Sequence, residues 1–214
     1  GNVRAAQAQS ALETPEMTVS YEGGTGPGGA AATTPGGGKL TRIEAKGPFV
    51  MTRGTSDRVT GNSATFDALA ETALLDGNIV MTAVPSRRVT ADRVELDQKS
   101  DSAVLTGRVE VVNGETVLTG RRLYVDRKNG RTSLTAPPMS GNGPGRITAH
   151  FVQKSTGAKK PEPAPTATAA GIAQFKTSPD APLDIEADSL DVDDTARVAI
   201  FRGDVLTRQG EVTM

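Results

Sequence analysis

Apolar and polar residues alternate with a period of two along most of the chain, and the alternation itself repeats. The repeat is clearest where three similar stretches follow one another: VTGNSATFDALAETALLDGNIVMTAV, RVTADRVELDQKSDSAVLTGRVEVV and ETVLTGRRLYVDRKNGRTSL. Superposing Gly61 on Ala91 and Gly120 gives spacings of 30 and then 29 residues. Repeats of this length are typical of units that cannot bury their apolar faces alone and that must cover one another.

The repeats place residues of the same kind in the same columns. The columns are Ala64, Val94 and Leu123; Phe66, Leu96 and Val125; and Asp67, Asp97 and Asp126. In the first two copies a glycine, Gly77 or Gly107, follows ten residues after the aspartate. We expect antiparallel strands of about eight to ten residues joined by short turns, because no apolar stripe of helical period and useful length occurs. Asn113-Gly114 and Asn129-Gly130 suit hairpin connections. The predicted fold class is all-β.

The flanks of the repeat contain further predicted strands and two segments of low hydrophobicity. The additional strands are Met17–Tyr21, Leu40–Ala45, Phe49–Thr52 and Arg146–Val152, with Gly47-Pro48 breaking the second from the third. The glycine-rich residues 23–38 predict a flexible surface loop, and residues 154–181, rich in Ala, Pro, Thr and Lys, predict a disordered linker.

The end of the chain contains the repeat again. Ala187, Leu190, Val192 and Asp193 fall in the established columns, and Gly203 follows ten residues after Asp193. Residues 203–214 also superpose without gaps on residues 1–12. We therefore expect a β-domain over residues 1–153 that lacks its first strand pair, the linker 154–181, and the opening strand pair of a second unit over residues 182–214.

The composition narrows the function classes. Aromatic residues make up only 3% of the chain, so a core would be built from Val, Leu, Ile, Ala and Met and would pack thinly. The 24 basic and 25 acidic residues are spread along the chain and form no polybasic patch for nucleic acid. The absence of cysteine excludes disulfides, thiolate metal sites and cysteine catalysis. No apolar run reaches the roughly twenty residues of a membrane helix.

The candidate catalytic and metal-binding residues have simpler interpretations. His150 has no second histidine or cysteine with which to share a metal, so an exposed or hydrogen-bonded strand histidine is favoured. The recurring aspartates could form calcium sites or glycosidase carboxylates, but each lies where a strand meets a turn, where Asp commonly binds neighbouring backbone N–H groups. Arg87-Arg88 and Arg121-Arg122 could meet lipid phosphates, although a solvated surface or an edge guard is the simpler interpretation. Residues 23–38 lack the lysine and Ser/Thr of a phosphate loop.

Several short motifs resemble the OstA-like (LptA) family of periplasmic lipopolysaccharide-transport proteins. Residues 182–188 (PLDIEAD) leading to residues 201–205 (FRGDV) resemble the opening strand pair of that family. Residues 75–80 (LDGNIV) and 105–109 (LTGRV) resemble its recurring glycine unit, and residues 117–126 resemble a strand that ends in aspartate. The resemblance covers most of residues 1–153 together with 182–214.

This resemblance implies a folded β-jelly-roll built from repeated antiparallel strand pairs and a role without catalysis or cofactors. It implies a periplasmic protein, whose signal peptide we expect to precede Gly1, that holds lipid A acyl chains and joins other β-jelly-roll proteins, or copies of itself, edge to edge between the inner and outer membranes. The inward-facing candidates for lipid binding are Phe66, Ile79, Met81, Val94, Leu96, Val109, Val111, Leu123 and Val125. The alternative is a structural β-repeat, such as an adhesin-type solenoid, in which these residues form a filled core without a ligand.

Overall fold

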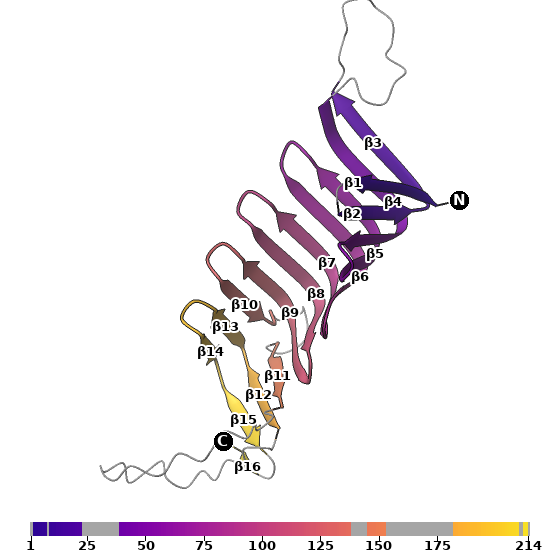
Figure 1. The fold of residues 1–214 in the computed structure, drawn as a ribbon. Coiled ribbons are helices and arrows are strands. Elements are labelled where there is room, and N and C mark those ends of the chain that lie inside the picture. Colours follow the sequence, from indigo (N-terminus) through magenta and orange to yellow (C-terminus); the bar gives the residue numbers. More distant parts are fainter. Residues whose placement is uncertain are drawn as a thin grey trace, which may run out of the picture.

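The computed structural model describes residues 2–7, 9–22, 39–137, 145–152, 182–209 and 212–213. These residues form one antiparallel sheet of 16 strands and contain no helix (Figure 1). The all-β prediction and the repeated antiparallel strand pairs are confirmed. The predicted loop 23–38 and the predicted linker 154–181 lie outside the described residues.

The strands follow one another along the sheet nearly in chain order (Figure 1). They are β1 (Val3–Gln7), β2 (Ser10–Thr14), β3 (Glu16–Glu22), β4 (Lys39–Arg53), β5 (Asp57–Asp67), β6 (Thr72–Ala83), β7 (Arg87–Asp97), β8 (Ser102–Asn113), β9 (Thr116–Asp126), β10 (Arg131–Thr135), β11 (Ile147–Phe151), β12 (Leu183–Ala187), β13 (Ser189–Asp193), β14 (Val198–Arg202), β15 (Leu206–Gln209) and β16 (Val212–Thr213).

The central strands β5 to β9 contain 11 or 12 residues each, more than the eight to ten that the sequence predicted. Each pair of neighbours in this region has a register shift near the middle, which is the mark of a bulge and bends a strand. The shifts occur at Thr60/Ser63, Asp76/Ile79, Thr90/Arg93 and Thr106/Val109. The bends line up across the sheet, so the sheet folds over on itself into two layers.

Strand β4 shows the same feature at its predicted break. The sequence predicted two strands separated at Gly47-Pro48, but the structure has a single strand with a register shift between Lys46 and Phe49. This prediction was wrong because the pairing with β5 resumes immediately beyond the bulge, where Phe49 lies opposite Gly61. The glycine, at φ +91°, and the proline produce a bend rather than an end.

At the C-terminal side, separate short strands continue the two layers. Strand β10 pairs with the second half of β9, and β11 pairs with its first half. Strand β13 then pairs with β10, and β12 pairs with β11. The segment that resembles an opening strand pair therefore extends the sheet of the preceding strands in both layers.

Candidate lipid-binding interior

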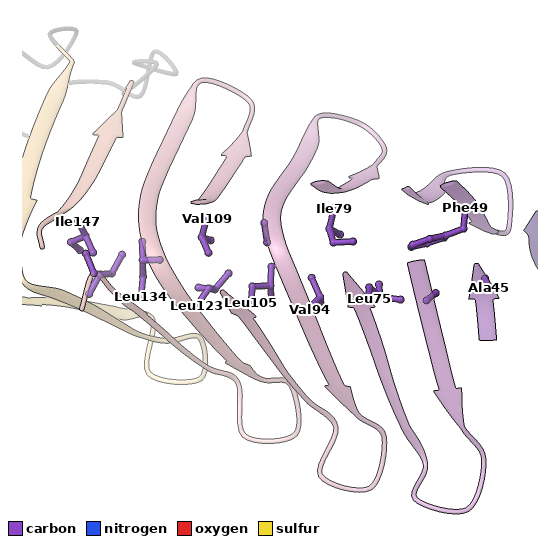
Figure 2. Close-up of a cluster of buried hydrophobic side chains, with 14 of the residues drawn as sticks. Ala45, Phe49, Leu75, Ile79, Val94, Leu105, Val109, Leu123, Leu134 and Ile147 are labelled. Atoms are coloured by element: carbon purple, nitrogen blue, oxygen red, sulfur yellow. The ribbon is translucent and has the colours of Figure 1, made fainter. Parts of the chain in front are cut away.

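The space between the two layers is lined by rows of apolar residues that run across the strands. In the first layer, Ala64 pairs with Leu75, Leu75 with Val94, Val94 with Leu105, and Leu105 with Leu123. In the second layer, the corresponding row beside the bend contains Phe49, Gly61, Ile79, Ala91, Val109 and Gly120. Figure 2 shows labelled members of these rows between the ribbons of the two layers. We call these two rows the inner rows.

The apolar side chains of the inner rows are shielded from solvent. Val94 and Ile79 are 0% exposed, and Leu123, the most exposed of them, is 6% exposed. Burial of such side chains is worth about 1.5 to 3 kcal/mol each. The inner rows therefore form a closed core along the bend.

Two further rows lie beyond the inner rows, nearer the free ends of the layers, and we call these the outer rows. Their members are half-buried and pack against the core. The outer row of the first layer contains Phe66, Leu96, Ala103, Val125 and Val192, and that of the second layer contains Met51, Val59, Met81, Val89, Val111 and Leu118. The interior is thus closed at the bend. Toward the free ends of the two layers, where the outer rows lie, it leaves apolar surface accessible, and we call this open side the mouth.

The nine residues selected from the sequence divide between these rows. Ile79, Val94, Val109 and Leu123 lie in the inner rows, and Phe66, Met81, Leu96, Val111 and Val125 lie in the outer rows. All nine face the space between the layers, as the alternation predicted. Lipid contact at these residues stays a prediction.

The interior also contains residues that were not selected from the sequence. Leu75 and Leu105 are buried between Ala64, Val94 and Leu123. Each precedes the repeat glycine by two residues, so the column was visible in the sequence. Its direction was visible too, because Leu75 and Leu105 each lie four residues before an inward residue, Ile79 or Val109, on the same strand.

Glycine is required in the inner row where large side chains converge. A Cβ at Gly61 would lie 2.4 Å from Cδ1 of Ile79 and 2.7 Å from Cε1 of Phe49. A Cβ at Gly120 would lie 2.6 Å from Cδ1 of Leu134. The alternation of large and absent side chains lets the layers approach closely with almost no large aromatic residues.

The bends are built from a glycine on one strand and an acidic or amide side chain on its neighbour. The pairs are Gly77 with Asn62, Gly107 with Asp92, and Gly203 with Asp188, and every one of these glycines has a positive φ. In the Gly107 bend, the Asp92 carboxylate accepts hydrogen bonds from the backbone N–H and the guanidinium of Arg108. The hydrogen bond from the Arg108 side chain lowers the pKa of Asp92.

The recurring aspartates bind turn backbone, as predicted. Asp67 Oδ1 accepts hydrogen bonds from the N–H groups of Leu69 and Ala70, at 3.0 and 2.7 Å. Asp97, Asp126 and Asp193 accept equivalent bonds within their own turns. The pKa of Asp97 is lowered mainly by the backbone hydrogen bond from Ser100, and that of Asp126 mainly by the side-chain hydrogen bond from Asn129. The interpretation as turn residues is confirmed.

Backbone hydrogen bonds join each of these turns to the turn before it or, for the first turn, to strand β4. The donor and acceptor pairs are Ala68 N–H to Thr41 O, Gln98 N–H to Glu71 O, Arg127 N–H to Asp101 O, and Asp194 N–H to Gly130 O. Glu71, Asp101 and Gly130 have positive φ, which turns their carbonyl groups toward the neighbouring turn. We call this series the turn ladder.

Among the remaining candidate groups, His150 lies on the outer face of β11. His150 Nδ1 lies 2.6 Å from Oδ1 of Asp184 on the adjacent strand. Within the described segments, no three His, Cys, Asp or Glu side chains are arranged to hold a metal ion. A search of the same segments for a helix long and apolar enough to cross a membrane found none.

Both ends of the folded sheet have edge strands. At the N-terminal end, Val3 on β1 and Val19 on β3 are 43% and 36% exposed, and both strands are edges. At the C-terminal end, the Phe151 and Phe201 rings meet edge to face, with their centroids 6.4 Å apart. Val198 and Ile200 on the edge strand β14 are 45% and 44% exposed, so both ends present strand edges next to accessible apolar side chains.

A repeated antiparallel sheet bent into two layers around an apolar interior defines the fold. Residues 88–180 match the family model described as LptA/(LptD N-terminal domain) LPS transport protein. This match agrees with the resemblance found in the sequence.

Among solved structures, the chain is similar to that of LptH from Pseudomonas aeruginosa, described as the LptA homologous periplasmic component of the conserved lipopolysaccharide transport device. The sequence identity is 17% and the TM-score is 0.41, over 50% of this chain and 82% of that chain. No curated protein matches the chain.

Proposed function

We propose that the protein is a periplasmic lipopolysaccharide-transport module that holds lipid A acyl chains between its two layers. The single observation that carries this proposal is the pair of half-buried outer rows beside a closed core. The family match of residues 88–180 supports lipopolysaccharide as the cargo.

The outer rows suit flexible acyl chains. Their side chains are aliphatic or thioether groups with a single aromatic ring, Phe66, so the surface is apolar without being rigid. Each methylene removed from water contributes about 0.8 kcal/mol, and a chain lying along a row would cover several strands. The inner rows already fill their own volume, so we expect the lipid to contact the outer rows first.

The proposed bridge role uses the strand edges. Strands β1 and β3 end the two layers on one side, and an edge with free backbone groups can be completed by a strand of another protein. We propose that related β-jelly-roll proteins, or further copies of this chain, pair with these edges to continue the sheet between the inner and outer membranes.

Site-specific photocrosslinking tests the carrier role. A photoreactive residue at Leu96, in an outer row, should crosslink to lipopolysaccharide in cells, whereas one at Glu95, which has the opposite orientation in the same strand, should not. Equal crosslinking at both positions would indicate nonspecific contact. A folded, exported protein that crosslinks at neither position would contradict the carrier role and favour the structural β-repeat, with which the closed inner core agrees.

A further inference from the structure

The mouth of the interior lies between two sets of turns with different charged residues. The turns of the first layer, such as 67–72 and 97–102, carry the aspartates that bind turn backbone. The turns of the second layer connect β4 to β5, β6 to β7, and β8 to β9. Four arginines lie in or beside these second-layer turns: Arg53, Arg58, Arg87 and Arg88.

Eight of the sixteen arginines that the structure describes pair with a carboxylate, and these four do not. Arg42, Arg93 and Arg108 pair with Glu44, Glu95 and Asp92. In the part of the chain that the structure describes, none of the four second-layer arginines forms an ion pair, and all four are exposed. Their positive charges are therefore available to a ligand.

Two of the four arginines lie on the inward face of their strands. Arg53 lies two residues beyond Met51 on β4, and Arg87 lies two residues before Val89 on β7. Because side chains two apart share a face of a strand, both arginines border the mouth next to an outer row. Arg58 and Arg88 have the opposite orientation and lie on either side of Thr82 on the outer face.

We infer that Arg53 and Arg87 form a binding site for the phosphate groups of an amphiphile whose acyl chains contact Met51, Met81 and Val89. This inference rests on the proposed function and adds the headgroup site and the orientation of the lipid. A guanidinium binds phosphate through paired N–H donors, and the adjacent apolar rows lower the local polarity and strengthen that contact. An amphiphile with phosphates at one end matches this arrangement of charge and apolar surface.

The opposite lip carries charges of both signs, because Lys99 accompanies Asp97 and Arg131 accompanies Asp126. The assignment of the phosphate site therefore rests on Arg53 and Arg87. The row that joins the two arginines contains one carboxylate, Asp57, which lies opposite Arg53 and accepts a hydrogen bond from Ser56 Oγ. Arg53 and Arg87 are three strand spacings apart, about 14 Å, so each would meet a different phosphate.

The test compares two double variants of the full chain that remove the same charge. In R53Q/R87Q the changes face the mouth from β4 and β7, and in R58Q/R88Q they face outward from β5 and β7. The probes are lipopolysaccharide, the same lipopolysaccharide after enzymatic dephosphorylation, and inorganic phosphate. Binding is measured at two salt concentrations, and thermal unfolding checks that both variants stay folded.

We expect R53Q/R87Q to weaken binding of phosphorylated lipopolysaccharide roughly tenfold or more and to leave binding of the dephosphorylated form unchanged. R58Q/R88Q should have a much smaller effect, and R53K/R87K should restore part of the loss. Inorganic phosphate at low millimolar concentration should not displace the lipid.

Equal losses in both double variants would show a long-range charge effect and overturn the site, as would equal losses for both lipid forms. Displacement of the lipid headgroup by inorganic phosphate alone would show a free-phosphate site and overturn the assignment to lipid. If the unmodified protein binds both lipid forms equally, only the headgroup site fails. If it binds neither form, the proposed function fails with it.

Discussion

At the scale of single residues, the aspartate column shows how one side chain can define a turn. Asp67, Asp97, Asp126 and Asp193 each accept backbone N–H groups two or three residues ahead, which replaces hydrogen bonds that the strand can no longer make. The carboxylate must be ionised to accept these bonds at full strength. The turns are therefore coupled to pH.

The lowered pKa values of Asp97 and Asp126 predict a loss of stability in acid. Because the folded protein binds these protons more weakly than the unfolded chain, the stabilisation is complete above the ordinary value of 3.8 and is lost as the pH falls through the lowered folded-state values. D97N/D126N should therefore show a shallower fall of Tm between neutral and acidic pH than the unmodified chain.

Thermal unfolding followed by circular dichroism across that pH range measures the difference. Asparagine keeps an acceptor oxygen at each position, so both turns should form in the variant at neutral pH. Parallel Tm curves for the two proteins would contradict the coupling.

At the scale of the element, β4 is one bent strand where the local sequence pattern predicted two separate strands. The sequence indicated strands, turns and columns correctly because alternation and turn residues are local properties. It did not indicate the bend in β4, because the residues Gly47-Pro48 are compatible both with the end of a strand and with a bulge after which the pairing with β5 resumes. Only the pairing of Phe49 with Gly61 distinguishes the two outcomes.

The bend at Gly107 predicts a substitution effect larger than that of an ordinary turn glycine. Ala at this position would have an unfavourable φ of +98°, and its Cβ would lie 2.3 Å from Oδ2 and 2.5 Å from Cβ of Asp92. Asp92 would have to move away from Arg108. G107A should lower the free energy of unfolding by about 2 to 4 kcal/mol.

Gly114 provides the matched control. It also has a positive φ, +62°, but its Cβ would meet only Ser86 Oγ at 3.9 Å. G114A should therefore cost about 1 to 2 kcal/mol, from the backbone alone. Urea unfolding of both variants measures the difference, and equal losses would show that the contact with Asp92 has no role.

At the scale of the whole molecule, the two layers have edges at both ends of the sheet. The sequence indicated a further copy of the repeat within residues 182–214. It could not show how residues 183–209 pair, because that depends on edges left by β10 and β11 far earlier in the chain. In the same way, the sequence could not show that Arg53 and Arg87 lie at one mouth, because the bends in the strands bring them there.

The exposed edge at β3 predicts self-association if the ends join as proposed. The unmodified chain should show a mass that rises with concentration, and V19K should reduce this rise because a buried lysine at the joint would lose its hydration. V84K, in an exposed turn away from that edge, is the control. Sedimentation at several concentrations gives the masses, and a monomer at all of them would count against pairing between copies.

The turn ladder has a consequence for how such a protein can change in size. Three backbone hydrogen bonds each join one turn to the turn that follows, from Glu71 to Asp194, and a fourth joins the first turn to Thr41 of β4. A duplicated pair of strands would bring its own acceptor and donor and would need no new type of contact. The length of the sheet would then depend on the number of strand pairs, because each pair adds about 10 Å.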